Sequence, residues 1–351
     1  MLYTDVQYLP GDRTFYSQLL PVLEQEDIMP QIYNLLRHKG KLSQTPLDFQ
    51  MKLQRRRETT MFQNMYVKRE TEQVLRLFDR VGISAIWLKG TRFAERFFGD
   101  LGDRPTSDID ILVPRELSNE VISALLSIGY DGPHNDIPGH YHETFIKQTN
   151  DLHPLILEVH YNVIRTTDGD VNLKEFWEEA QIIESYQCIY ELSINHTFYM
   201  ACIHATRHWF ESEKTRIDIL QILNNKDFTV DLFEILNKSR RDDTLSLVCT
   251  VLSNLYELYP FLKGVQSLPH GLENNHFRTR FRSKVALNLA IIEGWPRKIQ
   301  YLNRWLFPPA QEARLWIRRG RKEHVGFLQL YVLLYWQRLN KLISILTTAD
   351  N

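Results

Sequence analysis

Cysteine is scarce in this chain, with three among 351 residues and no CxxC pair. Cys188, Cys202 and Cys249 each stand in an apolar stretch, which favours buried free thiols over a disulfide or a metal centre. An excess of charge of either sign is also lacking, because the formal net charge is −1. The composition therefore gives no general reason to expect nucleic-acid binding, although a local basic patch stays open.

Long uninterrupted apolar runs are missing as well. The opening residues MLYTDVQYLPGDRTFYSQLL contain no basic region followed by an apolar run, so we expect no signal peptide. The most apolar late stretch, residues 327–336, is too short to cross a bilayer and includes Gln329, which is typical of an amphipathic packing helix. We therefore expect a cytoplasmic protein without a transmembrane segment.

The hydrophobic spacing divides the chain into three regions, without repeats or low-complexity segments. Apolar residues lie three and four apart over residues 13–80, which predicts helices that Gly82 ends. Strand-length apolar runs then alternate with short helical patterns, and beyond about residue 170 the spacing is helical. The sequence thus predicts an α+β fold with a helical N-terminal segment (1–80), a small mixed β-sheet core (81–170) and an all-helical C-terminal region (171–351).

The individual elements follow from the same spacing. We expect strands at residues 83–88, 109–113, 143–148 and 156–161, and helices at residues 91–98 and 117–128. Residues 131–140 are rich in Gly, Pro and Asn, which favours a loop. In the C-terminal region we expect helices at residues 192–210, 216–223, 230–238, 246–258, 284–292 and 323–346.

The most informative stretch is WLKGTRFAERFFGDLGDRPTSDIDILVP. Asp108 and Asp110 begin a predicted strand, and the alternation of side chains directs both carboxylates to one face. Two like charges this close are unfavourable unless a cation lies between them, and Mg²⁺ prefers such oxygen ligands. Ser107 precedes the pair, and apolar Ile109 and Ile111 occupy the opposite face. The alternative is a solvated strand start or turn.

A glycine turn precedes this strand. Gly90 stands between a predicted strand and a predicted helix, where the backbone can approach a ligand and the free N–H groups favour an anion. Lys89 and Arg104 are candidates to neutralise triphosphate oxygens. Alternatively, Lys89 is an exposed strand end and Arg104 pairs with Asp100 or Asp103.

A later apolar run, LILEVHY, contains a single acid, Glu158. A charge in such a strand is unfavourable without a partner, so we predict that Glu158 is the third carboxylate of a two-metal site. In such a site one ion activates an attacking hydroxyl and the other holds the leaving diphosphate. Glu158 would ligate the catalytic ion and accept the proton of the nucleophile. Alternatively, Glu158 and His160 face water on an edge strand.

Two further segments carry candidate residues. His204 and His208 share one face of a predicted helix, and their spacing can bind zinc, but the Glu of the HExxH motif is absent. We expect a polar helix face over the nucleotide, with Asp218 orienting one imidazole, or else histidines buried in helix packing. Residues 297–324 are basic with interleaved aromatics, which favours a solvated helix pair over a surface for single-stranded nucleic acid, an anionic acceptor or a membrane.

Taken together, these motifs resemble the uncharacterised nucleotidyltransferase family of the polymerase-beta-type superfamily. Its members carry an LKG turn, an Arg shortly before a DxD strand, and an acid before a His on a later strand, as in Leu88-Lys89-Gly90, Arg104, Asp108-Ile109-Asp110 and Glu158-Val159-His160. The resemblance covers roughly residues 80 to 225 and includes the segments 204–208 and 216–218. The usual Gly-Ser phosphate motif of the superfamily is Gly90-Thr91 here, which keeps the hydroxyl.

The resemblance implies a Mg²⁺-dependent enzyme with two ions, or Mn²⁺ in their place, that transfers a nucleoside monophosphate from an NTP to a hydroxyl or phosphate. Family members often lie among genes for surface polysaccharides or modified peptides, which implies a small-molecule, sugar or peptide acceptor. The implied catalytic metal ligands are Asp108, Asp110 and Glu158, and the implied nucleotide-binding residues are Lys89, Gly90, Thr91, Arg104, Ser107, His160, His204, His208 and Asp218.

Three other functions stay open. The same site could use a nucleotide sugar to modify a peptide. It could also belong to a toxin-like nucleotidyltransferase that acts on tRNA or protein, although we do not expect a nucleic-acid partner. A non-catalytic scaffold of this fold would bind no nucleotide, and the intact acid trio argues against it.

Overall fold

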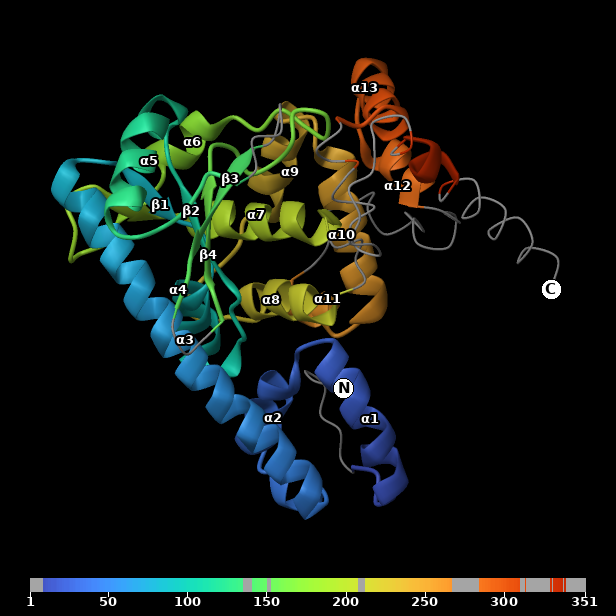
Figure 1. Ribbon diagram of the computed structural model, residues 1–351. Helices are drawn as coiled ribbons and strands as arrows, with labels where there is room; N and C mark the ends of the chain where they lie inside the picture. Colours follow the sequence, from blue (N-terminus) through green and yellow to red (C-terminus); the bar gives the residue numbers. More distant parts are fainter. Residues whose placement is uncertain are drawn as a thin grey trace.

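The computed structural model describes residues 9–134, 141–149, 153–207, 212–266 and 284–309, together with 313, 329, 331–336 and 338. Within these residues the chain forms a six-stranded mixed sheet with helices on both faces (Figure 1). The α+β fold predicted from the sequence is confirmed. None of the described helices combines the length and apolarity that a bilayer crossing requires.

The N-terminal segment is helical, as predicted. It consists of α1 (Arg13–Gln25), α2 (Met29–His38), the 3₁₀ turn η1 (Leu42–Gln44) and the long α3 (Leu47–Val81). The side chain of Asp12 accepts a hydrogen bond from the N–H of Thr14 and so caps α1. Gly82 ends α3 with a φ of 77°, the left-handed conformation that glycine adopts without strain.

The sheet has the strand order β3-β4-β2-β1-β6-β5. Its strands are β1 (Ala85–Trp87), β2 (Asp108–Leu112), β3 (His142–Lys147), β4 (Leu155–His160), β5 (Gln181–Ile182) and β6 (Ile189–Glu191). β2 pairs in parallel with β4 and antiparallel with β1. β4 therefore lies inside the sheet, between β2 and β3, and is not the edge strand of the alternative interpretation.

The helices that follow the core lie mostly beyond residue 190. They are α6 (Leu173–Glu178), α7 (Ile194–Arg207), α8 (Glu213–Leu223), α9 (Leu232–Arg241), α10 (Leu245–Leu258), α11 (Leu262–Val265), α12 (Lys284–Ile291) and α13 (Trp295–Leu306). β5 and β6 correct the expectation of helices alone beyond residue 170. Strands of two and three residues are too short for a hydrophobic period, and β6 is held by its parallel pairing with β1.

Short helical turns connect the central strands. α4 (Thr91–Phe93), the π-helical turn η2 (Ala94–Phe98) and the 3₁₀ turn η3 (Leu101–Asp103) lie between β1 and β2. The 3₁₀ turn η4 (Arg115–Leu117) and α5 (Ser118–Ser127) follow β2. Of the predicted helix over residues 323–346, only 329, 331–336 and 338 are described, and these are helical.

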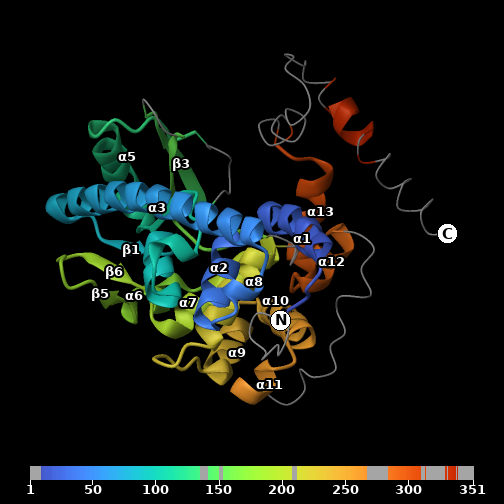
Figure 2. The same cartoon turned by 90° about the horizontal axis from the view of Figure 1, so that it is seen from below.

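The two faces of the sheet are buried against different helices. On one face Ile109 and Ile111 of β2 and Leu157 and Val159 of β4 pack with apolar residues of α3 and α5. On the other, Leu112 packs with residues of α7, α8 and α10. Figure 2 shows α5 on one side of the strands and α7 and α8 on the other. Side chains alternate along β2, so Asp108 and Asp110 share the face of Leu112.

The corner between α1 and α2 holds the start of α8. The carboxylate of Glu26 accepts a hydrogen bond from the N–H of Glu213 at 3.0 Å. The carboxylate of Asp27 bridges Arg56 of α3 at 2.7 Å and Lys214 of α8 at 3.1 Å. These contacts fix α8 to the N-terminal helices.

Candidate functional site

Three carboxylates from β2 and β4 lie on one face of the sheet. In the parallel pairing Asp110 is the register partner of Glu158. Asp108 precedes Asp110 by two residues and therefore points to the same side. The acids are about fifty positions apart in the sequence, and the pairing of the two strands brings them together.

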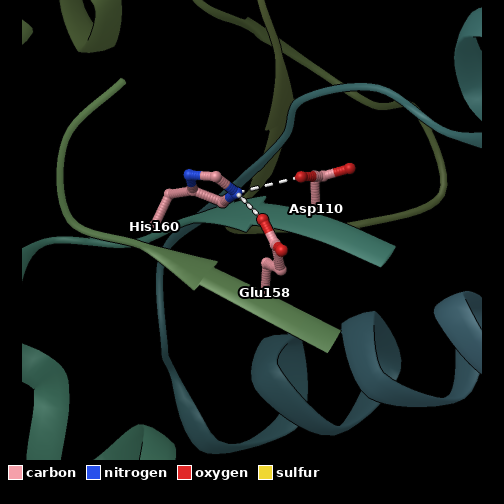
Figure 3. A group of neighbouring side chains, drawn as sticks. All are labelled: Asp110, Glu158 and His160. Atoms are coloured by element: carbon pink, nitrogen blue, oxygen red, sulfur yellow. Dashed lines mark hydrogen bonds and ion pairs between the residues drawn. The ribbon is translucent and has the colours of Figure 1, made fainter. Parts of the chain in front are cut away.

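His160 connects two of these acids. Its Nε2 lies 2.9 Å from Oδ1 of Asp110 and 3.4 Å from Oε2 of Glu158. In Figure 3 the ring nitrogen points at both carboxylates. The side chain of His160 is only 5% exposed, so His160 does not face water, as the edge-strand alternative required.

Asp110 is completely buried, which excludes the alternative of a solvated strand start. The ammonium of Lys89 lies 3.3 Å from its Oδ1, and the Lys89 side chain is 16% exposed, so Lys89 is not an exposed strand end either. Among the described residues no hydrogen-bond partner reaches the other carboxylate oxygen, Oδ2. A buried oxygen of an acid without a partner is unfavourable unless a ligand completes it.

The electrostatics separate the acids. Burial raises the pKa of Asp108, and the charge of Asp110 raises it further. Burial would also raise the pKa of Asp110, but Lys89 and the hydrogen bond with His160 outweigh it and lower that pKa well below its usual range. The pKa of Glu158 falls to about 2 because the hydrogen bond with His160 outweighs burial in the same way. Asp110 and Glu158 are therefore ionised at neutral pH.

The pKa of His160 moves in the opposite direction. Burial would lower it, but the hydrogen bonds to Asp110 and Glu158 raise it. His160 and Lys89 thus supply positive charge to a group of acids that would otherwise repel one another.

The glycine turn lies beside these acids. Gly90 has a φ of 76° and a ψ of −133°, a conformation that favours glycine. The hydroxyl of Thr91 is buried, and no described residue bonds it. Ser107 donates a hydrogen bond to Oδ1 of Asp108 at 3.2 Å. The turn therefore presents a buried hydroxyl next to the strand that bears the acids.

Arg104 has a different partner from the ones considered in the sequence analysis. Asp100 and Asp103 pair with Arg57 instead. Arg104 forms two hydrogen bonds of 2.8 Å with both carboxylate oxygens of Asp218. Asp218, which we expected to orient an imidazole, thus binds a guanidinium.

This ion pair links the glycine turn to α8. The guanidinium of Arg104 lies over the ring of Phe93, 4.9 Å from its centroid. Its Nη1 lies 3.5 Å from the carbonyl of Gly90 and 3.4 Å from the hydroxyl of Thr106. Arg104 therefore positions the glycine turn. Burial would lower the pKa of Arg104, but the charges of Asp218, Asp108 and Asp110 raise it.

The predicted histidine pair is described only in part. His204 lies half-buried on α7, and its charge helps to lower the pKa of Asp110, so it belongs to the surroundings of the site. His208 lies outside the described residues. In the described part of the chain, the one group of three potential metal ligands is Asp110, Glu158 and His160, whose ligand atoms lie within 4.8 Å of one another.

His142 joins this group although the sequence analysis did not select it. It is the register partner of His160 in the antiparallel pairing of β3 with β4. Its Nε2 lies 3.7 Å from Oε2 of Glu158, and the residue is 6% exposed. The only sequence signal is the polar residue at the start of HETFIK, which does not reveal its strand partner.

The chain also matches a known protein family. The model of the family described as uncharacterised nucleotidyltransferase matches residues 15–259, which include every element around the acids. The chain belongs to this family. None of the curated proteins compared with it matches. The protein is thus a nucleotidyltransferase that transfers phosphorus-containing groups and takes a nucleotide as substrate, and the acid group of β2 and β4 could hold the divalent metal that such enzymes usually need.

Proposed function

We propose that this nucleotidyltransferase moves a nucleoside monophosphate from an NTP to a hydroxyl or phosphate of a small-molecule, sugar or peptide acceptor, with Mg²⁺ as the divalent ion. One observation carries the proposal. Asp110 and Glu158 are register partners on parallel strands, and one buried oxygen of Asp110 has no hydrogen-bond partner among the residues that the structure describes. The surplus of acid over base in a buried group is what a cation site requires.

The residues present fit divalent metal ions. Asp108, Asp110 and Glu158 offer carboxylate oxygens, the donors that Mg²⁺ prefers. When bound, the ions would polarise the phosphoryl oxygens and lower the pKa of the attacking hydroxyl.

The surrounding side chains have separate roles. Lys89 neutralises triphosphate oxygens with its ammonium, which now lies against Asp110. Arg104 keeps the glycine turn in place, so that the turn and the Thr91 hydroxyl can bind phosphate. Ionised Glu158 accepts a hydrogen bond from the acceptor hydroxyl and takes its proton. The acceptor oxygen then bonds to the α-phosphorus, the bond to the bridging oxygen breaks, and diphosphate leaves.

Thermal-shift screening of NTPs and nucleotide sugars, with and without Mg²⁺, tests this proposal. A ligand at a hundred times its dissociation constant stabilises a protein by about 2.7 kcal/mol, which gives a measurable shift. We expect a shift from NTPs that needs Mg²⁺. A shift from nucleotide sugars alone would instead favour the other donor class.

The matched control is Asp110→Asn, which keeps the side-chain shape and removes one charge. We expect this variant to lose the Mg²⁺-dependent shift and to lower transfer from an α-labelled NTP by about 100- to 1,000-fold, the loss seen when one preorganised electrostatic group is removed. Transfer at the wild-type rate by the variant would remove Asp110 from the mechanism.

A further inference from the structure

We propose that the ion between Asp110 and Glu158 is bound through the imidazole nitrogen of His160 as well, so that this position prefers a first-row transition-metal ion such as Mn²⁺ over Mg²⁺. The inference rests on the proposed function and refines one of its two ions. The other ion, carried by the triphosphate, remains Mg²⁺.

The distances match those between ligands of a single ion. Neighbouring ligands at about 2.1 Å from a metal and at right angles to each other are about 3 Å apart. Nε2 of His160 lies 2.9 Å from the Asp110 oxygen and 3.4 Å from the Glu158 oxygen. The three atoms come from two adjacent strands of one sheet, so their spacing is set by the backbone pairing.

The donor chemistry sets the preference. Mg²⁺ requires oxygen ligands in a regular octahedron, whereas imidazole nitrogen suits transition-metal ions. An ion that takes oxygen ligands alone gains nothing from a nitrogen donor at the position of His160. His160 follows Glu158 by two residues and lies on the same face of β4. Its buried nitrogen therefore favours an ion that binds both nitrogen and oxygen ligands.

An ion pair alone explains the contacts less well. If His160 only neutralised the acids, Oδ2 of Asp110 would stay buried with no partner among the described residues, which is unfavourable. An ion bound by the Asp110 carboxylate would supply the partner that Oδ2 lacks. The contact of Asp110 with His160 thus leaves a carboxylate oxygen that a metal ion could bind.

His142 provides a matched control within the same cluster. It is also a buried histidine that approaches Glu158, at 3.7 Å, but it is not part of the group of ligand atoms formed by Asp110, Glu158 and His160. His142→Gln should therefore leave the metal-bound nitrogen in place, whereas His160→Gln should remove it.

The experiment is pulsed electron paramagnetic resonance of the full-length protein with Mn²⁺ as the probe. We expect the wild type to show the modulation of a directly bound ¹⁴N nucleus, and the modulation to change when histidine is labelled with ¹⁵N. It should persist in His142→Gln and disappear in His160→Gln. The wild-type result alone decides whether nitrogen is bound, even if His160→Gln does not fold.

Titration calorimetry with Mn²⁺ and Mg²⁺ gives the second readout. His160→Gln should weaken Mn²⁺ binding at least about tenfold, a loss typical even of residues that only support a ligand, and leave Mg²⁺ binding nearly unchanged. Mn²⁺ bound without a nitrogen signal, a signal that His142→Gln removes, or no Mn²⁺ binding at all would each overturn the inference. A Mg²⁺-dependent nucleotide shift would still uphold the proposed function, and only its absence would overturn that too.

Discussion

Two buried clusters of charge in this molecule differ in how completely they are paired. In the helical region Lys238 lies 2.9 Å from Glu175 and 3.2 Å from Asp242. Asp242 also accepts hydrogen bonds from the Tyr199 hydroxyl at 3.0 Å and from the N–H of Asn172 at 3.3 Å. Each oxygen of Asp242 thus has a partner, and the cluster joins α9 to α6 and α7.

The cluster on β2 and β4 is arranged differently. Asp108, Asp110 and Glu158 share Lys89 and His160, and one buried oxygen has no partner among the described residues. Incomplete pairing of buried acids is costly to the fold and is kept where a ligand completes it. We call the group of Lys238, Glu175 and Asp242 the structural cluster, because its charges are paired within the protein, and the acids of β2 and β4 the candidate functional cluster.

Removing the cation of the structural cluster should give the largest loss of stability. Lys238→Met would leave the buried carboxylate of Asp242 without its ammonium, and breaking a buried pair typically costs about 3 to 5 kcal/mol. Urea unfolding measures the free energy of unfolding. The matched control is Lys174→Met, which removes an ion pair from a side chain that is 78% exposed and should cost at most about 1 kcal/mol. Similar losses of unfolding free energy for both variants would show that the buried Lys238 contributes no more to stability than an exposed ion pair.

The structural cluster should also make stability depend on pH. Burial, together with the charge of Lys238, lowers the pKa of His196 to about 4. The imidazole of His196 therefore binds a proton near pH 6.5 in the unfolded state but only near pH 4 in the folded state. The free energy of unfolding consequently falls as the pH drops from about 6.5 to 4. The total loss is on the order of 3 kcal/mol.

His196→Phe tests this dependence, because Phe also stacks on Phe176 as the imidazole now does. Unfolding free energies at a series of pH values should show that the variant loses the part of the slope between about pH 6.5 and 4. An unchanged difference between wild type and variant across this range would contradict the assignment.

A smaller effect of opposite sign separates two acids of the site. The pKa of Asp108 is raised, so its charge is unfavourable in the folded state, and Asp108→Asn should raise the free energy of unfolding by about 0.5 to 2 kcal/mol at neutral pH. The pKa of Asp110 is lowered, so Asp110→Asn should destabilise. Both variants should lose transfer. Melting curves of both variants measure the direction of each change in stability. Equal shifts in melting temperature would show that the two acids do not differ in their effect on the fold.

Much of the candidate site could be predicted from the sequence because strand alternation is a local property. Asp108 and Asp110 had to share a face, and one acid in an apolar run marked Glu158 as exceptional. The long α3 was predicted for the same reason, since its period spans many turns. What the pattern could not provide was the parallel register that sets Asp110 opposite Glu158.

The contacts that sequence reasoning missed join distant segments. Arg104 and Asp218 are 114 positions apart, and only the folded chain shows that they pair with each other rather than with nearer charges. His142 enters the site through an antiparallel pairing that follows a loop. β5 and β6 are too short to carry a period and exist because neighbouring strands pair with them.

The acidic corner of Glu26 and Asp27 has a consequence for control of the enzyme. Glu26 and Asp27 bind the start of α8. Asp218 of α8 forms an ion pair with Arg104, and Arg104 lies against the carbonyl of Gly90. The position of the glycine turn at Gly90 thus depends in part on helices that contribute none of the three acids. Sequence changes in the first two helices could tune the affinity for nucleotide from a distance and leave the three acids untouched.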